Sequence, residues 1–390
     1  MIGAADLDRP AVLVLEDGTV FGGTAFGAGG ETFGEMVFNT GMTGYQETLT
    51  DPSYCGQIVA MTAPHIGNTG VNDTDPESRR IWVSGYVIRE PSRITSSWRA
   101  QRSLEAELQA AGVTAIAITG TRALTRHLRE RGAMRAAIAA GPADPQELLG
   151  RVLASPPMTG ADLAQAVSTG QPYTVPPPDG RPARFAVAAV DLGIKASTPR
   201  YLAGLGCAVT VLPATVTAAQ ILARSPDGVF FSNGPGDPAA AGYAVQAMRG
   251  VLAAGVPVLG ICLGSQIMGL ALGLATYKLR FGHRGVNQPV ADLRTGRVQI
   301  TSHNHGFAVA MPGPGGPAWP PGAVRAPRRF DTAYGPAEVT HVGLNDGVVE
   351  GLRLLDAPAV TVQYHPEAAP GPHDATGEFA QFCALMERSR

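Results

Sequence analysis

The sequence predicts an α/β protein with a doubly wound, mostly parallel sheet, preceded by a smaller mixed α+β N-terminal domain. Two observations lead to this prediction. From about residue 185, apolar strand-like runs alternate with helix-compatible segments, which is typical of βαβ units and a parallel sheet. Before residue 150, several short β-like runs come first and helix-compatible segments follow, which indicates a separate domain of mixed structure.

The first domain is expected to span residues 1–150. It opens with apolar runs on either side of Asp17-Gly18, a strong β-hairpin signal. Further strands are predicted at 57–63 (QIVAMTA), 81–88 (IWVSGYVI) and 115–119 (AIAIT), and helices at 102–112 and 121–132. Residues 151–184 are interpreted as a linker region because of the Pro-rich stretch at 171–184 (QPYTVPPPDGRPAR).

The second domain is expected to span residues 185–390. Its predicted strands are 185–191, 207–213, 228–233 and 257–262, with helices at about 196–205, 217–225, 244–255 and from the last strand to about 275. The rest is more β-like, with runs such as VQITSHN, VVEGLRL and AVTVQYH. Residues 311–330 are rich in Pro and Gly and are interpreted as a long mobile loop.

Bulk composition is that of an ordinary soluble globular protein. The net charge of −2 gives no reason to expect a nucleic acid or an anionic membrane as partner. No apolar run approaches membrane-span length and the N-terminus does not resemble a secretory signal, so a cytoplasmic protein is expected. The four cysteines are far apart, with no metal-ligand spacing, and disulfides are not expected in that compartment.

Gly260-Ile261-Cys262-Leu263-Gly264 follows an apolar strand and opens a helix-compatible segment. This is the G-x-nucleophile-x-G elbow with cysteine as the nucleophile. Glycines suit the flanking positions because side chains there would collide with neighbouring strands. The helix N-terminus that follows favours a thiolate. Taken alone, the five residues fit a buried cysteine at a Gly-rich strand end about equally well.

A cysteine nucleophile needs a base and a group that orients the base. Gln363-Tyr364-His365-Pro366-Glu367 offers both. Because Pro366 argues against a helix, His365 and Glu367 are expected on extended backbone, with side chains on one face and within reach of each other. The histidines without this arrangement are interpreted as structural: His65, His127 and His341.

Two further segments suit substrate binding. SNGPGDP (232–238) follows a predicted strand, and its glycines allow backbone N–H groups to approach a ligand, although alone it would be interpreted as a turn. NHGF (304–307) is the other segment. Together with GICLGSQ and HPE, NGPGDP resembles the class I, triad-type glutamine amidotransferases, in the order that this family uses.

The first domain narrows the resemblance. Residues 34–72 (GEMVFNTGMTGYQETLTDPSYCGQIVAMTAPHIGNTGVN) and 121–132 (TRALTRHLRERG) are similar to the small subunit of carbamoyl-phosphate synthases. In the second domain VDLGIKASTPRYL, KLRFGHRGVNQPV, HNHGFAV and HPEAAPGPHD are similar to the same family. The resemblance therefore covers nearly the whole chain.

The resemblance implies a glutaminase in which Cys262 is the nucleophile, His365 the base and acid, and Glu367 the group that orients His365. The backbone N–H groups of Leu263 and Gly234 would hold the oxyanion. The amino and carboxylate groups of glutamine would be held by a set drawn from both domains: Ser53, Gly236, Gln266, Asn304, Gly306 and Phe307. Since Ser53 belongs to the first domain, the site would be completed across the domain interface.

The partners that the resemblance implies are L-glutamine and a large carbamoyl-phosphate synthase subunit. In this family a tunnel carries ammonia to that subunit, which uses ATP and bicarbonate to make carbamoyl phosphate for arginine and pyrimidine synthesis. The triad chemistry needs no cofactor or metal, so none is expected on this chain. It also lacks a GxxxxGK[ST] phosphate loop, so it is not expected to bind ATP.

Three features depart from the family pattern. Ser265 stands where relatives usually carry His or Asn, and tuning of the site is expected, not loss. Gly120 stands where many relatives have Asp. The loop at 311–330 is longer than usual and follows NHGF, so it is expected to affect access to the pocket.

Several alternative functions are left open by the residues. A glutaminase for anthranilate or GMP synthesis is opposed by the first domain. A stand-alone γ-glutamyl hydrolase would need no large partner, and a non-catalytic scaffold would bind one without consuming glutamine. The sequence does not distinguish an arginine, a pyrimidine or a specialised-pathway role, and it does not identify an effector or the oligomeric state of the holoenzyme.

Overall fold

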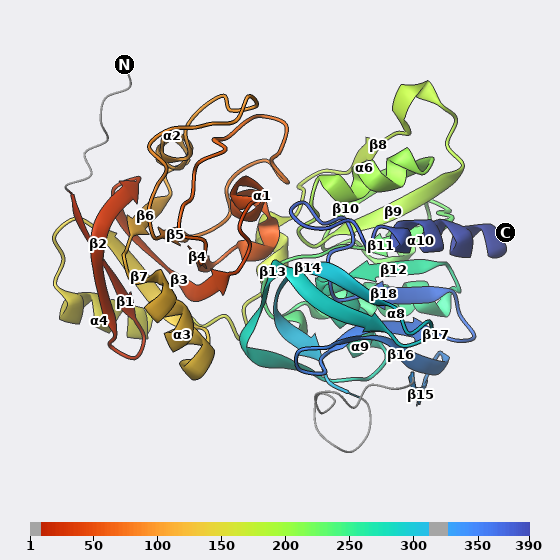
Figure 1. Ribbon diagram of the computed structural model, residues 1–390. Coiled ribbons are helices and arrows are strands. Elements are labelled where there is room, and N and C mark those ends of the chain that lie inside the picture. The colour runs from red at the N-terminus through yellow and green to blue at the C-terminus, as the bar shows by residue number, and fades with distance from the viewer. Residues whose placement is uncertain (1–8, 312–326) are drawn as a thin grey trace. The chain divides into compact units, whose positions relative to one another are not determined.

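The computed structural model describes residues 9–311 and 327–390. The chain divides into two compact units (Figure 1). Unit 1 ends at Met158 and also includes Arg280–Arg284, whereas unit 2 comprises Thr159–Leu279 and Gly285–Arg390. The first unit ends eight residues after the predicted boundary at residue 150. Helix α4 (Pro145–Ala154) crosses residue 150 and packs on strands of unit 1, so the division comes after this helix.

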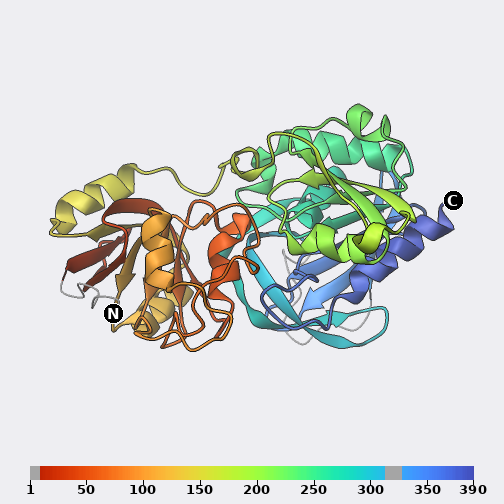
Figure 2. The same cartoon turned by 90° about the horizontal axis from the view of Figure 1, so that it is seen from above.

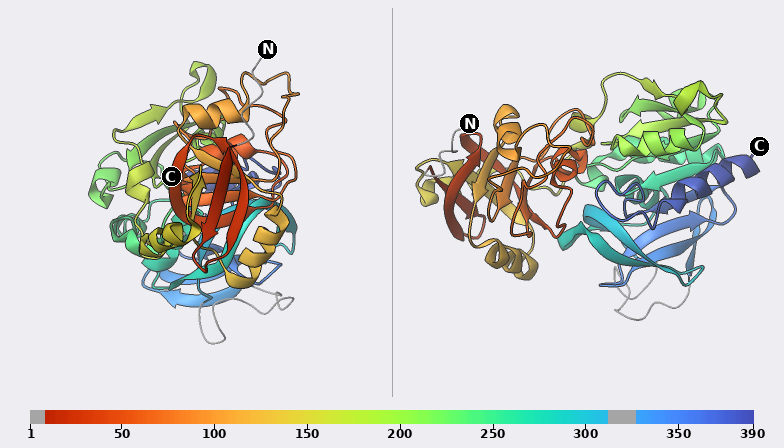
Figure 3. Two further views of the ribbon diagram at one scale, coloured as in Figure 1. Left: turned by 90° about the vertical axis from the view of Figure 1, so that its left-hand side faces the viewer. Right: turned by 45° about the horizontal axis from the view of Figure 1, so that its top comes forward.

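Unit 1 contains a closed barrel with strand order β1-β2-β6-β5-β4-β3-β7. Its strands are β1 (Pro10–Leu15), β2 (Val20–Gly27), β3 (Gly30–Asn39), β4 (Gln57–Met61), β5 (Gly85–Ile88), β6 (Thr114–Ala117) and β7 (Met134–Ala140). The pairs β3–β4, β4–β5 and β5–β6 are parallel and the others antiparallel. The hairpin predicted at Asp17-Gly18 joins β1 to β2, which face the viewer in Figure 3, left.

The helices of unit 1 are α1 (Tyr45–Thr50), η1 (Pro52–Tyr54, a 3₁₀ turn), α2 (Leu104–Ala110), α3 (Thr121–Arg131) and α4. Leu124 and Leu128 of α3 belong to the same buried cluster as Leu13, Ile58 and Ile138 of the barrel. The helices predicted at 102–112 and 121–132 are therefore confirmed. The strand predicted at 81–88 is shorter than expected, because pairing with β4 and β6 begins only at Gly85.

Unit 2 is built on one large sheet with order β14-β13-β16-β17-β18-β12-β11-β9-β10-β8, and β15 pairs with β16. Its strands are β8 (Tyr173–Val175), β9 (Phe185–Asp191), β10 (Cys207–Pro213), β11 (Gly228–Phe231), β12 (Val258–Ile261), β13 (Thr276–Asp292), β14 (Val298–Val309), β15 (Arg328–Thr332), β16 (Gly335–Gly343), β17 (Val349–Leu354) and β18 (Ala359–Val362). The run β10-β9-β11-β12-β18 is parallel, which confirms the predicted sheet.

Helices cover the parallel sheet of unit 2 on both faces. They are α5 (Ala164–Val167), α6 (Ser197–Gly204), α7 (Ala218–Leu222), α8 (Gly242–Ala253), α9 (Leu263–Ala271) and α10 (Gly377–Arg388), with 3₁₀ turns η2 (Pro178–Gly180) and η3 (Pro238–Ala240). Met248 of α8 and Ile267 of α9 belong to one core cluster. On the other face, α6 and α10 lie side by side (Figure 2). Tyr201 of α6 stacks on Phe379 of α10.

Two predicted irregular segments contain regular structure. The predicted linker region 151–184 contains the end of α4, the short helix α5 (Ala164–Val167) and β8 (Tyr173–Val175). Strand β8 extends the sheet through antiparallel pairing with β10. Within the predicted loop at 311–330, residues from Arg328 onward form β15, which pairs with β16. Both strands arise from pairing with distant partners that the Pro-rich composition does not reveal. Residues 312–326 lie outside the described residues.

Candidate active site

Cys262 sits on a strained turn between β12 and α9. Its backbone has φ 54° and ψ −103°, a combination that residues with a side chain rarely adopt. A Cβ on Gly264 would lie 2.1 Å from the carbonyl oxygen of Phe231, and one on Gly260 would lie 2.8 Å from the backbone of Gly264. The turn is therefore packed so closely that both flanking positions require glycine, as expected for a nucleophile elbow.

The thiol of Cys262 is buried and lies against β14. Cys262 is 2% exposed, and its Sγ lies 3.6 Å from the backbone oxygen of Asn304. The carbonyl of Cys262 accepts from the N–H groups of Ser265 and Gln266, which anchors the cysteine to the first turn of α9. The side chain therefore stands at a helix N-terminus, where the helix dipole favours a negative charge.

His365 and Glu367 follow β18 and their side chains meet as predicted, but the extended backbone predicted between them is wrong, because Pro366 and Glu367 form a turn. Nδ1 of His365 and Oε1 of Glu367 lie 2.7 Å apart, and both side chains are buried. The backbone N–H of His365 donates to the carbonyl of Ser302 at 2.8 Å, which ties this segment to β14. The carbonyl of His365 in turn accepts from the N–H of Ala368. The carboxylate of Glu367 therefore orients the imidazole ring, and the backbone hydrogen bonds fix the position of His365.

Lys195 completes a buried chain of charges that the sequence analysis missed. Its Nζ lies 3.0 Å from Oε1 of Glu367 and donates to the carbonyl of Ala368. Lys195 is 2% exposed. It lies just before α6 and is far from Glu367 in the sequence. The one available signal was that a buried lysine must have an acidic partner, and the sequence does not show which lysine is buried.

Charge coupling controls the protonation of the pair. Burial disfavours the imidazolium of His365, but the carboxylate of Glu367 and the charge and hydrogen bond of Cys262 outweigh it and raise the pKa of His365 to about 10. Burial likewise disfavours the ionised Glu367, but Lys195 and then His365 lower the pKa of that carboxyl to about 2. The arrangement therefore favours an imidazolium beside Cys262 at neutral pH.

The structure brings most of the predicted glutamine-binding residues of unit 2 together around Cys262. Nε2 of Gln266 donates to the carbonyl of Phe307 at 2.7 Å, which links α9 to the NHGF segment that also contains Asn304 and Gly306. A Cβ on Gly234 would lie 2.0 Å from the carbonyl of Leu192 and 2.9 Å from the side chain of Leu263. Gly234 therefore packs directly against the residue after the nucleophile.

Two other predicted binding residues lie in different settings. Gly236 has φ 91°, and a Cβ there would lie 2.5 Å from the carbonyl of Ala161, so its backbone packs against the segment before α5. Ser53 lies in unit 1, within η1, where its N–H donates to the side chain of Asp51. Its role in binding glutamine stays a prediction.

Comparisons with known proteins agree on one family. The family model "Carbamoyl-phosphate synthase small chain, CPSase domain" matches residues 13–138, and "Glutamine amidotransferase class-I" matches 188–385. The carbamoyl phosphate synthase small chain of Streptomyces coelicolor is 60% identical, over 98% of this chain and 97% of its own. The small chain of Streptomyces avermitilis is 60% identical, over 100% of this chain and 98% of its own. The small chain of Mycobacterium tuberculosis H37Rv is 56% identical, over 96% of this chain and 98% of its own.

The chain belongs to the carbamoyl phosphate synthase small chain family. Within this family it carries the class I glutamine amidotransferase domain, and it is the glutamine amidotransferase component. The two family models match separate parts of the chain: 13–138 lies in unit 1, and 188–385 lies in unit 2 except for Arg280–Arg284. Among the described residues, no helix is both long and apolar enough to span a membrane.

The departures from the family pattern have local explanations. The hydroxyl of Ser265 donates to Oγ1 of Thr361 at 2.9 Å, so this buried serine bonds α9 to β18 behind the nucleophile. Gly120 is the N-cap of α3, and the helix starts there without a side-chain cap that Asp would supply.

The histidines interpreted as structural take no part in the geometry around Cys262. His127 on α3 pairs with Asp17 at 2.6 Å, and His65 is exposed, both in unit 1. His341 on β16 is buried, and burial lowers its pKa to about 4. A neutral, buried imidazole fits a role in packing.

Proposed function

We propose that this chain hydrolyses L-glutamine to glutamate and ammonia through a thioester on Cys262. The observation that carries this proposal is the buried set of Cys262, His365 and Glu367, in which a strained elbow presents the thiol and the carboxylate holds the imidazole at 2.7 Å. A non-catalytic scaffold would not need the strained turn at Cys262.

The proposed reaction begins with attack of the Cys262 thiolate on the side-chain amide carbon of glutamine. The carbonyl π electrons move to oxygen and form an oxyanion, which the backbone N–H groups of Leu263 and Gly234 are proposed to stabilise. When this intermediate collapses, the C–N bond breaks and the imidazolium of His365 gives its proton to the leaving nitrogen, so ammonia is released.

Hydrolysis of the thioester completes the proposed cycle. Neutral His365 takes a proton from water as the water oxygen attacks the thioester carbon, and a second oxyanion forms. Its collapse breaks the C–S bond, which releases glutamate and restores the thiolate beside the imidazolium. Glu367 stays ionised throughout, because the pKa of its carboxyl is about 2, and it keeps the ring oriented.

The other proposed contacts hold glutamine and pass on its nitrogen. Ser53, Gly236, Gln266, Asn304, Gly306 and Phe307 are proposed to bind the amino and carboxylate groups of glutamine. Ammonia is proposed to pass to a large subunit that makes carbamoyl phosphate from bicarbonate and ATP, for arginine and pyrimidine synthesis. The proposed location is the cytoplasm, where the thiol of Cys262 would stay reduced.

Substitution Cys262→Ser tests the proposal in the complex with the large subunit. Serine is nearly isosteric but its hydroxyl is far harder to ionise than a thiol, so glutamine-dependent carbamoyl phosphate synthesis should fall to background. Synthesis from added ammonium salt should stay near the wild-type rate, because it bypasses Cys262. Cys55→Ser, at a half-buried cysteine of unit 1, is the matched control and should keep both activities.

Two outcomes would contradict the assignment. Retained glutamine-dependent synthesis in the Cys262→Ser protein would remove Cys262 as the nucleophile. Loss of carbamoyl phosphate synthesis from both glutamine and ammonium salt would point to a structural role for this cysteine. A chain that hydrolyses glutamine but never associates with a large subunit would support the stand-alone hydrolase.

A further inference from the structure

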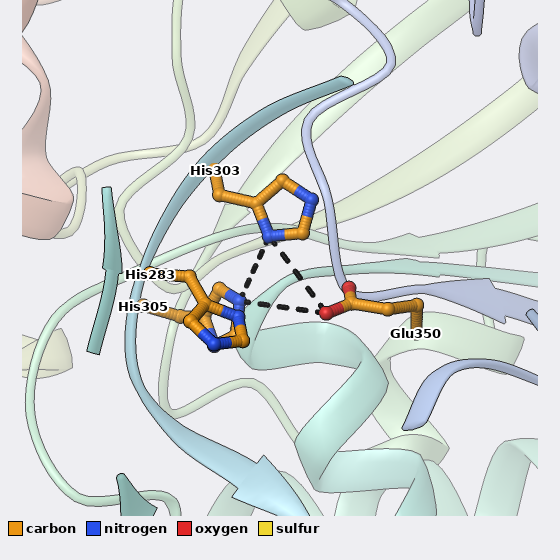
Figure 4. Close-up of side chains that lie close together, drawn as sticks. All are labelled: His283, His303, His305 and Glu350. Atoms are coloured by element: carbon orange, nitrogen blue, oxygen red, sulfur yellow. Dashed lines mark hydrogen bonds and ion pairs between the residues drawn. The ribbon is translucent and has the colours of Figure 1, made fainter. Parts of the chain in front are cut away.

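Three ionisable side chains that the proposed hydrolysis does not use meet in the interior of unit 2. His303 and His305 lie on β14, two residues apart, so their side chains point to the same face of the strand. Glu350 reaches them from β17 (Figure 4). The exposed fractions of the three side chains are 1%, 1% and 0%. Burial of such groups requires compensation by a charge or a ligand.

The distances between the three facing atoms fit a single metal ion. Nδ1 of His303 lies 3.1 Å from Nε2 of His305, and Oε1 of Glu350 lies 3.8 Å from the first nitrogen and 4.0 Å from the second. One point in the plane of these atoms lies about 2.1 Å from all three, which is the length of a zinc–nitrogen or zinc–oxygen bond. A tetrahedral ion lies out of this plane, so the three side chains must draw slightly closer together to keep bonds of that length.

The outer hydrogen bonds orient both histidines for ligation. The hydroxyl of Thr301 donates to the carbonyl of Gln288 at 2.8 Å, so it can only accept from Nε2–H of His303, which lies 2.8 Å away. Nδ1–H of His305 donates to the carbonyl of Phe307 at 2.9 Å. Such bonds from the far ring nitrogen accompany metal-ligating histidines.

These bonds determine what occupies the space between the two rings. In neutral imidazoles, the protons on Nε2 of His303 and Nδ1 of His305 leave lone pairs on the other two nitrogens. Those lone pairs face each other across 3.1 Å, with the Glu350 carboxylate beside them. Two acceptors at this distance repel unless a cation lies between them, either a metal ion or a shared proton.

We propose that His303, His305 and Glu350 bind one Zn²⁺ ion. Two imidazole nitrogens and one carboxylate oxygen suit zinc, whereas magnesium and calcium prefer oxygen ligands alone. Water fills the fourth position of the tetrahedron. His283, also drawn in Figure 4, belongs to the segment Arg280–Arg284 that groups with unit 1 and is not one of the three proposed ligands.

The ion would brace the strand that lies against the nucleophile. In the sheet, β13 and β16 separate β14 from β17, so a shared ion adds a link that backbone hydrogen bonds do not make. Between the two histidines lies Asn304, whose carbonyl is 3.6 Å from the thiol of Cys262. Two residues beyond His305, the carbonyl of Phe307 accepts from Gln266. The zinc is thus a positioning element for the NHGF segment, not a catalytic group.

Metal analysis of the untagged full-length chain tests the proposal. The chain is unfolded in denaturant with a chelator, refolded with or without Zn²⁺, freed of loose metal by gel filtration and measured by plasma mass spectrometry. Because the site is closed, uptake is expected on refolding. Wild type should retain about one zinc per chain and melt at a higher temperature than the metal-free chain.

Matched variants locate the ion. His303→Gln and Glu350→Gln should retain less than about 0.1 zinc per chain, because each removes one of three ligands. His65→Gln, at an exposed histidine of unit 1, should bind zinc like wild type. Refolding with Co²⁺ should give wild type the visible absorption bands of a tetrahedral site, and Glu350→Gln should lack them.

Two results would overturn the zinc site. Wild type that refolds to its native circular dichroism yet retains less than about 0.1 zinc per chain would show that the histidines share a proton. Equal zinc in wild type and in both ligand variants would place the metal elsewhere. If a variant fails to refold, the wild-type zinc content and Co²⁺ spectrum still decide. Neither measurement depends on glutamine hydrolysis.

Discussion

Lys195, Glu367 and His365 form a line of charges inside unit 2, and each changes the protonation of the next. Lys195 lies 3.0 Å from the carboxylate of Glu367, which lies 2.7 Å from the imidazole. Glu367 therefore stays ionised in spite of complete burial. The pKa of His365 is raised to about 10, so its imidazole keeps the proton at neutral pH. An imidazolium that is stable at neutral pH has a proton ready for the leaving ammonia.

Substitution of His365 should damage glutamine hydrolysis more than substitution of Glu367. His365→Asn removes the group that transfers protons and should lower kcat by about 10²–10⁴-fold, whereas Glu367→Gln removes only orientation and charge stabilisation. Steady-state ammonia release measures both. Glu367→Gln leaves Lys195 buried without its carboxylate, so circular dichroism must show that the variant is folded. A lower kcat for folded Glu367→Gln than for His365→Asn would reverse the two roles.

Glu378 predicts a pH dependence of stability. Burial raises the pKa of this α10 carboxyl from its ordinary value of 4.5 to about 7. The folded chain therefore binds this proton more tightly than the unfolded chain, and the stabilisation is complete below pH 4.5 and lost as the pH rises to 7. Glu378→Gln lacks this loss, so its stability relative to wild type should increase over that range by on the order of 1–3 kcal/mol.

Urea denaturation of both proteins at several pH values between 4.5 and 7 measures this difference. His341, whose Nε2 lies 4.0 Å from the same carboxyl, is present in both proteins and contributes to both curves. A stability difference that does not change with pH would show that Glu378 is ionised in the folded chain.

At the scale of elements, glycines within helices have opposite surroundings. Gly150 lies in α4, and nothing comes within 4 Å of the position that its Cβ would take. Gly250 lies in α8, and a Cβ there would lie 2.4 Å from the Cβ of Ala218 on α7. Gly150 loses more backbone freedom on folding than another residue would, and no close neighbour requires a glycine there. Gly250, in contrast, allows α8 to approach α7.

Gly150→Ala should stabilise the protein by about 0.5–1 kcal/mol, because alanine loses less backbone freedom on folding. Gly250→Ala should destabilise it by about 1–3 kcal/mol, because α7 and α8 must separate. Urea denaturation followed by far-ultraviolet circular dichroism compares the two variants with wild type. If both substitutions stabilised the chain, the close approach at Gly250 would not control the packing of α8.

At the scale of the whole molecule, the chain consists of two units with separate cores. Unit 1 buries the clusters around its barrel. The two largest clusters of unit 2 include residues of α8 and α9 in one and of α6 and α10 in the other. Units that fold around their own cores can move relative to one another unless a partner restrains them. The proposed glutamine contacts include Ser53 of unit 1 as well as residues of unit 2, so catalysis is expected to depend on that restraint.

The isolated chain should therefore hydrolyse glutamine slowly, and the large subunit should accelerate it. Ammonia release is measured with and without saturating large subunit, at the same chain concentration and without ATP. Cys262→Ser with the same partner gives the background rate. Equal rates in the presence and absence of the partner would contradict this dependence.

The features that the sequence determined by itself are local in the chain. Gly260 and Gly264 flank Cys262 within one tight turn, and His365 and Glu367 lie only two residues apart, so spacing predicts that these side chains meet. The turn at Pro366-Glu367 that joins the second pair was not predicted. The alternation of strands and helices after residue 185 predicts the parallel sheet, because each βαβ unit is continuous in sequence. The β1–β2 hairpin follows from Asp17-Gly18 for the same reason.

Only the tertiary structure decided the features that join distant segments. Closure of the barrel pairs β1 with β7, and β8 and β15 are strands because they find partners in β10 and β16. The pairing of Lys195 with Glu367, and the meeting of His303 and His305 with Glu350, join segments whose strands are not neighbours in the sheet. A pattern of residues specifies which face of a strand is buried, but the partner across that face is set by long-range packing of the whole unit.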